Sequence, residues 1–450
     1  MTLRIAVDFE GGRAAASSAL LATVGESLAP LGVELRLADS ISDLQAGDLT
    51  VRVSAHPRPW YSARRCVEVS SLTDLETCLQ VLARDGLGET LLRGSPREWR
   101  TAVVRRLGPP LDTAARLYLF GAGLVGRQAA GMAASCGVVP DCLLDNDAAL
   151  QGRSFDGISV VAPRDADLAG ATVVVCTGRH SAAITTQLRG LGAGRVLSLS
   201  EFCFLLGSPS FPDHDYFADL KCNRLRYVGL IARLADAPSR DVLAAVLTHR
   251  LTLAAGPLLD ACSDDQWFIP EVFTARKDAL FVDGGAYDGD TAVEFIRRNG
   301  GPGRGMELFE PDACLAEAAR RRVASVPGAR VHRAGLSARS GVMQFASTGG
   351  MDGAIALDHG EVIDVVTVDG SVGARVTYLK LDVEGAEEAA LRGARRTIAV
   401  AHPVIAVAAY HRAADLWRLP AWIDAHAQGC TLYLRHHTEL AFETVVYART

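Results

Sequence analysis

The fold of the C-terminal part of the chain is decided by the stretch ALFVDGGAYDGDT at residues 279–291. Its four leading apolar residues predict a buried strand, and the small residues after them predict a tight turn into a helix that starts near Ala292. The strand ends on Asp283, while Asp288 and Asp290 in the turn would repel a phosphate placed there. Asp283 and the open N–H groups of such a turn suit a ligand that carries an ammonium and a carboxylate, as an amino acid does.

Two further strands end in groups that fit the rest of such a ligand. Residues 305–309 predict a strand that ends in Glu310, 27 residues after Asp283, where a carboxylate can accept from two ribose hydroxyls. Residues 329–333 predict a third strand, and the small and apolar residues 334–337 after it suit an adenine slot. Because ligands of open α/β sheets lie beyond the carboxyl ends of the strands, these ends predict a pocket for S-adenosylmethionine. The predicted cofactor contacts are Asp283, Gly284, Gly285, Ala286, Tyr287, Asp288, Gly289, Thr291, Glu310, Pro311, Gly335, Leu336 and Asp382.

Acids and histidines follow the remaining strands of the predicted sheet. These strands are expected over 376–381, 403–409, 431–435 and 443–448. The first of them ends in Asp382 and Glu384, which alternation places on one side of an extended chain. His411 follows the second strand, and the last two flank His436 and His437 as an antiparallel hairpin that closes the sheet. The acids and His411, with either His436 or His437, are therefore expected at the ligand-bearing edge.

These side chains supply candidates for removing a proton from an acceptor. His411 is the first candidate base because histidine titrates near neutral pH, although a histidine that only holds a loop fits the sequence equally well. His437 and His436 come next, and one of this adjacent pair is expected to point away. Asp382 is expected either to bind the acceptor or to act as base. Glu384 is either part of the site or a cap of the following helix.

A metal ion and a lysine complete the predicted edge. Asp382, Glu384 and His411 have the ligand types for a divalent ion, but their spacing does not decide whether one binds, so the metal is left open. Lys380 is one of only three lysines among 46 basic residues. We expect it to pair with a carboxylate beneath the pocket, with direct substrate contact as the alternative. The predicted catalytic group is therefore His411, Asp382, Glu384, His437 and Lys380.

Several ordered motifs in residues 215–450 resemble the FkbM family of methyltransferases. The matching stretches are FVDGGAYDGDT at 281–291, FEPD at 309–312, LKLDVEGAE at 379–387 and YLRHH at 433–437. The QWF segment at 266–268 is also similar, although the family form usually has tyrosine in place of Trp267. The resemblance implies a Rossmann-like class I methyltransferase fold, S-adenosylmethionine as donor, and O-methylation of a sugar or another natural-product hydroxyl. The acceptor implied is a small molecule, such as a sugar or glycosylated metabolite, which a nucleotide can carry.

A second glycine loop lies in residues 113–207. Gly121, Gly123 and Gly126 form a GxGxxG motif between a strand and a helix, and Asp145 lies 19 residues beyond, where a ribose-binding acid is expected. This segment resembles the N-terminal domain of PglD-type sugar acyltransferases, which implies a nucleotide or nucleotide-sugar pocket. An NAD(P)-dependent oxidoreductase, a nucleotide-sugar-binding module and an accessory domain with an empty loop remain alternatives.

Length and composition complete the predicted organisation. The 450 residues, with a net charge of −6, suit several α/β domains and exclude a chain-wide basic field for nucleic acid. The division expected is an α/β accessory domain (1–112), the Rossmann-like unit (113–207), a helical lead-in (208–278) and the methyltransferase domain (279–450). No apolar run reaches membrane-spanning length and no signal peptide is indicated. Scattered cysteines without zinc spacing favour free thiols. We therefore expect a cytoplasmic protein without membrane partners, with a homo-oligomer possible.

Overall fold

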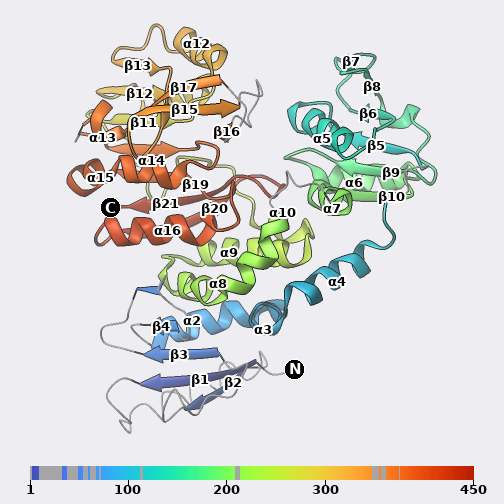
Figure 1. The fold of residues 1–450 in the computed structure, drawn as a ribbon, viewed down its shortest axis with the longest axis horizontal. Helices are drawn as coiled ribbons and strands as arrows, with labels where there is room; N and C mark the ends of the chain where they lie inside the picture. Colours follow the sequence, from blue (N-terminus) through green and yellow to red (C-terminus); the bar gives the residue numbers. More distant parts are fainter. Residues whose placement is uncertain are drawn as a thin grey trace.

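The computed structural model describes most of the chain. The described residues are 3–9, 33–37, 49–53, 59–60, 67–69, 72–111, 115–207, 213–346, 354–355, 361–373 and 375–450. Within them the chain forms four β-sheets, two of them in the C-terminal part (Figure 1). The sequence pattern of residues 14–28 predicts a helix, but this segment lies outside the described residues.

The main C-terminal sheet contains seven strands. They are β11 (Leu280–Gly284), β12 (Gly305–Phe309), β13 (Ala329–His332), β18 (Tyr378–Leu381), β19 (Val404–Ala408), β20 (Thr431–His436) and β21 (Thr444–Arg449). Their order is β13-β12-β11-β18-β19-β21-β20, and the first five are mutually parallel. β21 runs antiparallel to both β19 and β20. The predicted Rossmann-like methyltransferase fold with a C-terminal antiparallel hairpin is therefore confirmed.

Helices and a small second sheet surround this sheet. The helices are α11 (Asp290–Asn299), α12 (Ala313–Arg322), α13 (Val368–Ser371), α14 (Glu387–Gly393), α15 (Arg395–Ala401) and α16 (Asp415–His426). The small sheet consists of β14 (Gly335–Leu336), β15 (Gly341–Ala346), β16 (Ala354–Ile355) and β17 (Glu361–Val366). β11, β12 and β18 are buried almost throughout because parallel strands are covered on both faces. Phe281 of β11 stacks on Phe295 of α11 with ring centres 4.5 Å apart.

Residues 115–207 form a separate α/β unit. Its strands are β5 (Leu117–Phe120), β6 (Cys142–Leu144), β7 (Ser154–Phe155), β8 (Ile158–Val161), β9 (Thr172–Val175) and β10 (Arg195–Ser198). Its helices are α5 (Leu124–Ser135), η5 (Pro163–Asp165), α6 (Ser181–Gly190) and α7 (Leu199–Leu206). The strand order is β10-β9-β5-β6-β8-β7, with the glycine loop at the end of the central strand β5. This is the mixed α/β unit that the sequence predicts.

The N-terminal part contains a four-stranded parallel sheet. Its strands are β1 (Leu3–Phe9), β2 (Val33–Leu37), β3 (Leu49–Val53) and β4 (Val67–Val69), in the order β2-β1-β3-β4. Nearby, Trp60 is buried and its indole N–H donates to Oδ2 of Asp424 in α16 at 3.0 Å. The N-terminal part is thus tied to the C-terminal domain as well as to its own neighbours.

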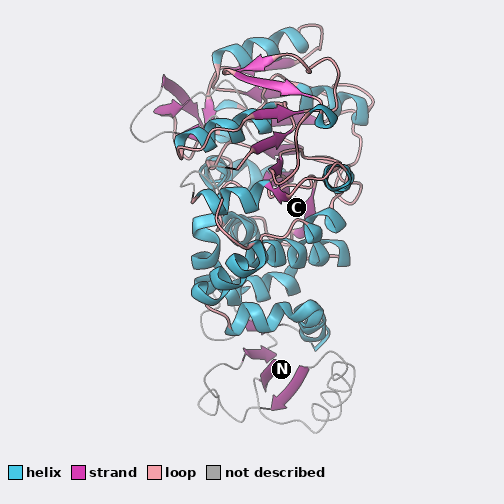
Figure 2. Ribbon diagram, turned by 90° about the vertical axis from the view of Figure 1, so that its right-hand side faces the viewer, coloured by secondary structure: helices cyan, strands magenta, loops and turns pink. Residues whose placement is uncertain are grey.

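A layer of helices lies between the N-terminal sheet and the C-terminal domain (Figures 1 and 2). Its members are α2 (Leu72–Ala83), η4 (Arg84–Gly86), α3 (Leu87–Arg93), α4 (Pro96–Leu107), α8 (Asp213–Arg233), α9 (Ala237–Thr252) and α10 (Gly256–Ala261). α2, α3 and α4 all pack on α8 and α9, and α9 packs on β20. The helices before residue 112 therefore share a core with the predicted lead-in, although the sequence places them in different segments.

The hairpin between β20 and β21 reaches the middle unit. Glu439 at its tip accepts backbone N–H groups of His180 and Ser181 at the start of α6, and its own N–H donates to Gly178 at 3.0 Å. This carboxylate caps a helix of another domain. The strand that carries His436 and His437 is thus mechanically connected to the middle unit.

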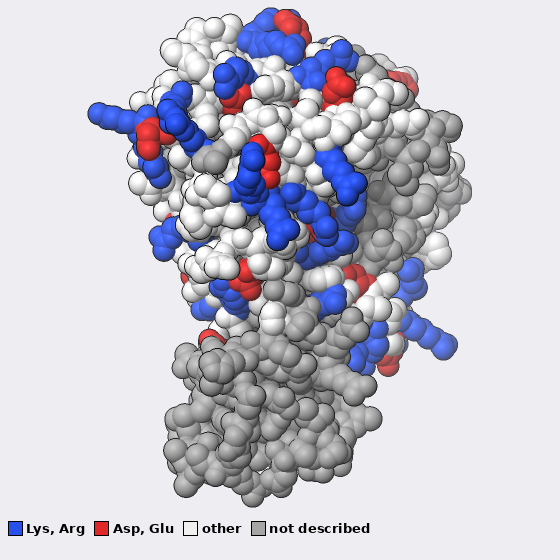
Figure 3. Space-filling view, turned by 60° about the vertical axis from the view of Figure 1, so that its left-hand side comes forward, with Lys and Arg blue, Asp and Glu red and all other residues white. Residues whose placement is uncertain are grey.

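Surface charge, helix length and the state of the cysteines can be compared with the expectations from the sequence. On the face drawn in Figure 3, Lys and Arg side chains are more widespread than acidic ones, and several have an acidic neighbour. In the described part of the chain, no helix combines the length and apolar character that crossing a bilayer requires. The cysteines that the structure describes are free thiols.

Candidate active site

The glycine loop after β11 is clamped between the ends of two neighbouring strands. The N–H groups of Gly285 and Ala286 both donate to the carbonyl of Phe309 in β12, at 2.9 and 3.0 Å. Gly285 has a φ of +73°, and a Cβ there would lie 1.8 Å from the carbonyl oxygen of Asp382 after β18. Only glycine fits this position. The predicted cofactor loop and the predicted catalytic acid are therefore in direct backbone contact.

A buried ion pair lies beneath this loop. Lys380 and Asp283 are almost completely buried, and the ammonium lies 2.9 Å from Oδ1 of Asp283. The same ammonium donates to the carbonyls of Gly285 and Gly284, at 2.6 and 3.3 Å. Burial raises the pKa of Asp283 to about 6, and the lysine opposes that shift. The carboxylate pair expected for Lys380 is confirmed.

This burial changes the expected role of the Asp283 carboxylate. Its exposed fraction is 0%, so it meets Lys380 and not solvent. A ligand's ammonium reaches it only if the loop opens, which the sequence did not anticipate. Oδ2 of Asp283 has no hydrogen-bond partner among the described residues. In this structure the Asp283 carboxylate is therefore a partner of Lys380 beneath the loop.

Glu310 lies at the end of the neighbouring strand, where the sequence predicts it. Its two oxygens accept the N–H groups of Tyr287 and Asp312, each at 2.9 Å, so it joins the glycine loop to the start of α12. Burial raises the pKa of Glu310 to about 7. Each carboxylate oxygen keeps a lone pair for a further donor such as a ribose hydroxyl. Pro311 beside it is half-buried.

The other predicted cofactor contacts are distributed around this loop. Asp288 forms an ion pair with both terminal nitrogens of Arg322 in α12, at 2.5 and 2.6 Å, and Thr291 lies in the first turn of α11. Leu336 of β14 lies against Gly284, because a Cβ on that glycine would come 2.7 Å from its side chain. Gly335 is half-buried beside it. The glycine loop, Glu310 and β14 thus lie along one edge, where half-buried groups and small residues fit S-adenosylmethionine.

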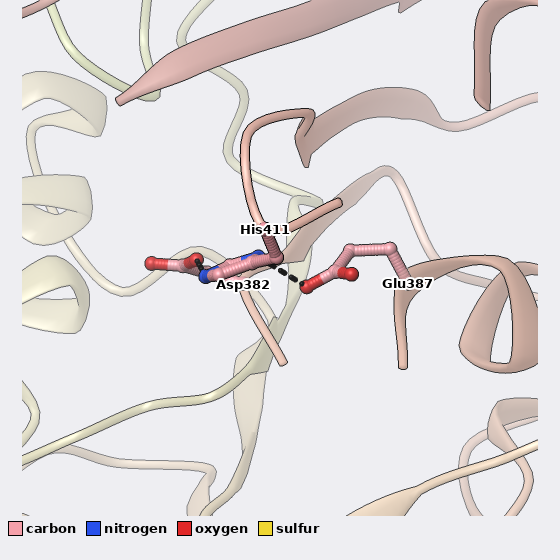
Figure 4. A group of neighbouring side chains, drawn as sticks. All are labelled: Asp382, Glu387 and His411. Atoms are coloured by element: carbon pink, nitrogen blue, oxygen red, sulfur yellow. Dashed lines mark ion pairs between the residues drawn. The ribbon is translucent and has the colours of Figure 1, made fainter. Parts of the chain in front are cut away.

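His411 is the centre of a cluster of carboxylates at the ends of β18 and β19. Its Nε2 lies 3.1 Å from Oε2 of Glu384 and 3.6 Å from Oδ1 of Asp382, and its Nδ1 lies 2.9 Å from Oε1 of Glu387. Figure 4 shows the ring between Asp382 on one side and Glu387 on the other. Asp382 also accepts the hydroxyl of Tyr410 at 3.1 Å. The structure therefore brings together the three residues that the sequence placed on this edge.

The charge of this cluster corrects the reason for choosing His411 as base. Burial lowers the pKa of His411, but Glu387, Glu384 and Asp382 outweigh it and hold the pKa well above the ordinary value. The ring as it stands keeps its proton at neutral pH. It is therefore not a free neutral base, contrary to the argument from its intrinsic titration.

Glu387 is the residue of this cluster that the sequence interpretation missed. It is buried, and its Oε1 also accepts the N–H groups of Val383 and Gly385, at 2.9 and 3.2 Å. This carboxylate shapes the turn after β18 and holds His411 at once. The signal was present in the DVEGAE motif at 382–387, where a third acid follows at the start of a helix.

Strained backbone conformations concentrate around the site. Eight described non-glycine residues have positive φ, and four of them are Trp267, Tyr287, Glu384 and Glu443. Glu384 lies in the carboxylate cluster, and Tyr287 lies in the glycine loop. The hydroxyl of Tyr410, which donates to Asp382, also lies 3.4 Å from Oε1 of Glu443. The ring of Trp267 lies 5.0 Å from the ammonium of Lys380. Such strain persists where the surroundings enforce it, commonly at functional sites.

The hairpin histidines have structural partners. His437 uses Nδ1 for the carbonyl of Ser263 and Nε2 for the hydroxyl of Tyr447, both at 2.9 Å. Burial lowers the pKa of His437 to about 4. His436 is fully buried, with Nδ1 2.9 Å from the hydroxyl of Thr444. With both ring nitrogens engaged, His437 is not positioned as a free proton acceptor, and its catalytic role stays a prediction.

The second glycine loop is held by the acid that the sequence assigned to a ribose. The carboxylate of Asp145 accepts the N–H groups of Ala122 and Asp147, at 2.8 and 2.9 Å. Gly121 has a φ of +112°. A Cβ on Gly126 would lie 1.7 Å from the carbonyl oxygen of Gly121. The motif therefore permits close packing of α5 on β5. Gly123 has open space around it, and nucleotide binding here stays a prediction.

The C-terminal part of the chain is similar to a known family of proteins. Residues 283–437 match the family model described as the methyltransferase FkbM domain. This FkbM-like region covers about a third of the chain. It contains all five predicted catalytic residues and almost the whole glycine loop. A methyltransferase is therefore the class of protein that the match supports, and no curated protein sequence matches the chain.

Solved structures extend the likeness beyond this region. A methyltransferase FkbM from Methylobacillus flagellatus KT has a TM-score of 0.59 at 22% identity, covering 84% of this chain and 98% of its own. This identity establishes a shared fold alone, over more of the chain than the FkbM-like region. A candidate rRNA methylase from Clostridium thermocellum reaches a TM-score of only 0.28 at 8% identity, over 39% of this chain and 87% of its own.

Proposed function

We propose that the protein is an S-adenosylmethionine-dependent O-methyltransferase acting on a hydroxyl of a sugar or of a glycosylated or other natural-product small molecule. The observation that carries the proposal is the backbone contact between Gly285 and Asp382. It joins a cofactor-type glycine loop on β11 to the acid and histidine cluster after β18 and β19. The match of residues 283–437 to the methyltransferase FkbM domain supports the methyltransferase class.

The residues that would hold the cofactor follow from the edge of the sheet. The glycine loop and Glu310 would hold its amino acid and ribose parts, and Gly335 and Leu336 would hold the adenine. When bound, S-adenosylmethionine would supply a methyl group carried on a cationic sulfur. Its transfer to a hydroxyl forms an O–CH3 bond, breaks the S–CH3 bond, and releases a thioether and the hydroxyl proton. The protein's own contribution is positioning, which can supply much of the rate acceleration.

The acceptor hydroxyl would be received by the carboxylate cluster. Asp382 and Glu384 have side chains 22% and 27% exposed, so they are accessible, whereas Glu387 is buried behind His411. The two accessible carboxylates can bind a hydroxyl and take up its proton, and Glu387 and Tyr410 hold them and His411 in place. Proton transfer by a positioned group is worth about 10²–10⁴-fold in rate.

Calorimetric titration with S-adenosylhomocysteine tests the cofactor. We expect micromolar binding that Glu310→Gln weakens strongly, with Glu317→Gln on the surface of α12 as the matched control. Binding of NADH without any adenosylhomocysteine signal would reverse the proposal in favour of an oxidoreductase. In that case the Gly121–Gly126 loop would be the candidate dinucleotide site.

A methyl-transfer screen against sugar nucleotides and glycosylated metabolites tests the acceptor class. With an acceptor in hand, we expect Glu384→Gln to lower kcat by about 10²–10⁴-fold while adenosylhomocysteine binding is retained. A His411→Ala enzyme with near-normal turnover would remove His411 from the mechanism. Transfer to an amine alone would contradict the O-methyltransferase proposal.

A further inference from the structure

We infer that Asp382, Glu384 and His411 form a binding site for a hard divalent cation of the Mn²⁺ and Mg²⁺ class, with Glu387 as the positioning residue. The inference deepens the proposed function and rests on it for the role of the cation. The site itself is argued from distances, burial and ligand chemistry.

The first argument is the direction of the ring nitrogens. Nε2 of His411 faces Oε2 of Glu384 at 3.1 Å and Oδ1 of Asp382 at 3.6 Å. An octahedral Mg²⁺ or Mn²⁺ with bonds of about 2.1 Å places neighbouring ligands about 3 Å apart. One ring nitrogen thus faces two carboxylate oxygens at 3.1 and 3.6 Å, close to the separation between neighbouring ligands of one ion.

The second argument is the partner of the other nitrogen. Nδ1 of His411 lies 2.9 Å from Oε1 of Glu387, on the opposite side of the ring from Asp382 (Figure 4). Histidines that bind metals almost always donate their other ring N–H to a carboxylate or carbonyl, which fixes the tautomer and the ring direction. Glu387 is 1% exposed, and its contact with Nδ1 is an ion pair without hydrogen-bond alignment, because Nδ1 of His411 and Oε2 of Glu387 have no hydrogen-bond partner among the described residues. It is therefore a buried carboxylate held against the back of the proposed ligand.

The third argument is exposure and support. Glu384 and Asp382 are partly open, so positions around an ion would remain for water or an acceptor oxygen. Tyr410 donates to Oδ1 of Asp382 and Glu387 fixes the turn that carries Glu384, so both ligands are held by further hydrogen bonds. Glu384 has a φ of +52°, a strained conformation of the kind that persists where the surroundings enforce it.

The ligand set also selects the class of ion. Two carboxylates suit Mg²⁺ and Mn²⁺, and an imidazole favours Mn²⁺ over Mg²⁺. Donor atoms of Asp382, His411 and the positioning residue Glu387 lie within 4.8 Å of one another, so the acids are gathered closely around the ring. A cation here would lower the pKa of a hydroxyl bound beside it, next to the loop that carries Gly285.

Titration of the chelator-treated full-length protein with Mn²⁺, followed by the electron paramagnetic resonance signal of the free ion, tests the inference. We expect one Mn²⁺ per chain in the unmodified protein and in the surface control Glu317→Gln. Glu384→Gln and Asp382→Asn should weaken binding at least tenfold. Glu387→Gln should weaken it about 10–100-fold while the stoichiometry stays at one, as expected for a positioning residue.

Failure of the cation site and failure of the proposed function are distinguishable. Adenosylhomocysteine binding without Mn²⁺ binding would overturn the metal site and leave the methyltransferase proposal standing. Mn²⁺ binding that Glu384→Gln does not alter would also overturn this site. Far-ultraviolet circular dichroism and adenosylhomocysteine titration of each variant show that the chain is folded, so a loss of Mn²⁺ binding in a variant that passes both supports the site.

Discussion

The ammonium of Lys380 lies 2.9 Å from the carboxylate of Asp283, and both side chains are enclosed directly beneath the glycine loop. The ion pair joins β18 to β11, and the ammonium also holds two carbonyls of the loop. The loop that would receive the cofactor therefore depends on a buried charge.

Replacing Lys380 by methionine should destabilise the C-terminal domain by about 3–5 kcal/mol, because Asp283 is left as an unpaired buried charge. The thermal midpoint measures the loss. The matched control is Arg392→Met, whose arginine is 58% exposed in its pair with Glu388 and should change stability by less than about 1 kcal/mol. Adding Asp283→Asn to Lys380→Met should recover part of the loss. Equal shifts for the two single variants would contradict the buried pair.

Lysine is scarce in this chain, and an arginine substitution tests whether position 380 requires one. A planar guanidinium cannot make the three short contacts of a compact ammonium, so Lys380→Arg should lower methyl transfer and adenosylhomocysteine affinity. If methyl transfer and adenosylhomocysteine affinity are both unchanged, the site does not require a lysine at position 380.

Gly285→Ala should weaken adenosylhomocysteine binding at least tenfold, because the added Cβ meets the carbonyl oxygen of Asp382 and must displace the loop. Gly300→Ala is a close control: its φ is +70°, but a Cβ there has nothing within 4 Å. It should cost about 1–2 kcal/mol of backbone strain and leave binding intact. Calorimetric titration compares them. If both variants bind equally, the contact between β11 and the end of β18 does not shape the site.

The buried His249 should make stability fall in acid. Burial lowers its pKa to about 4, from about 6.5 in an unfolded chain. Between these values the unfolded chain binds a proton that the folded chain does not, so its contribution is full above pH 6.5 and is lost as the pH falls toward 4. The difference amounts to about 3 kcal/mol. His249→Gln should therefore be less stable than the parent at pH 7.5 and approach it at pH 4.5. A gap in thermal midpoint that does not change with pH would contradict this.

Glu439 should stabilise the first turn of α6 from another domain. Glu439→Ala removes the acceptor of two helix N–H groups, which costs about 1 kcal/mol and should speed hydrogen exchange of residues 181–184 about fivefold. Glu439→Gln keeps an acceptor oxygen without the charge and should show a smaller change. Mass spectrometry of deuterium uptake measures both, with α5 as the internal reference. Equal acceleration in α5 and α6 would mean general destabilisation of the middle unit.

Much of the C-terminal fold could be predicted because its signals are local. Short apolar strands that end in Asp283, Glu310 and Asp382 recur at the spacing of βα units, and parallel strands bring such ends to one edge. The small sheet formed by β14 to β17 was not predicted. Its strands are short or lie in a segment without strong periodicity, and β14 pairs with a strand about 30 residues away.

The chemistry of the cluster could be predicted only in part. The sequence names His411 and its carboxylates as residue types, but the charge on the ring depends on three distances that no spacing encodes. Glu387 was missed because a helix-starting acid resembles an ordinary cap. The shared helical layer was missed because α2 and α8 are far apart in the chain and meet through apolar surfaces.

By itself, the sequence determined where the main strands of the C-terminal domain lie along the chain, the glycine loop, the family resemblance and the set of groups at one edge of the sheet. These follow from periodicity and from the backbone freedom of glycine, which act over a few residues. Only the tertiary structure decided that Asp283 is enclosed with Lys380, that His411 lies between carboxylates and that Glu439 caps a helix of the middle unit. Burial and distance between remote residues set these charges, and both arise when the sheets pack.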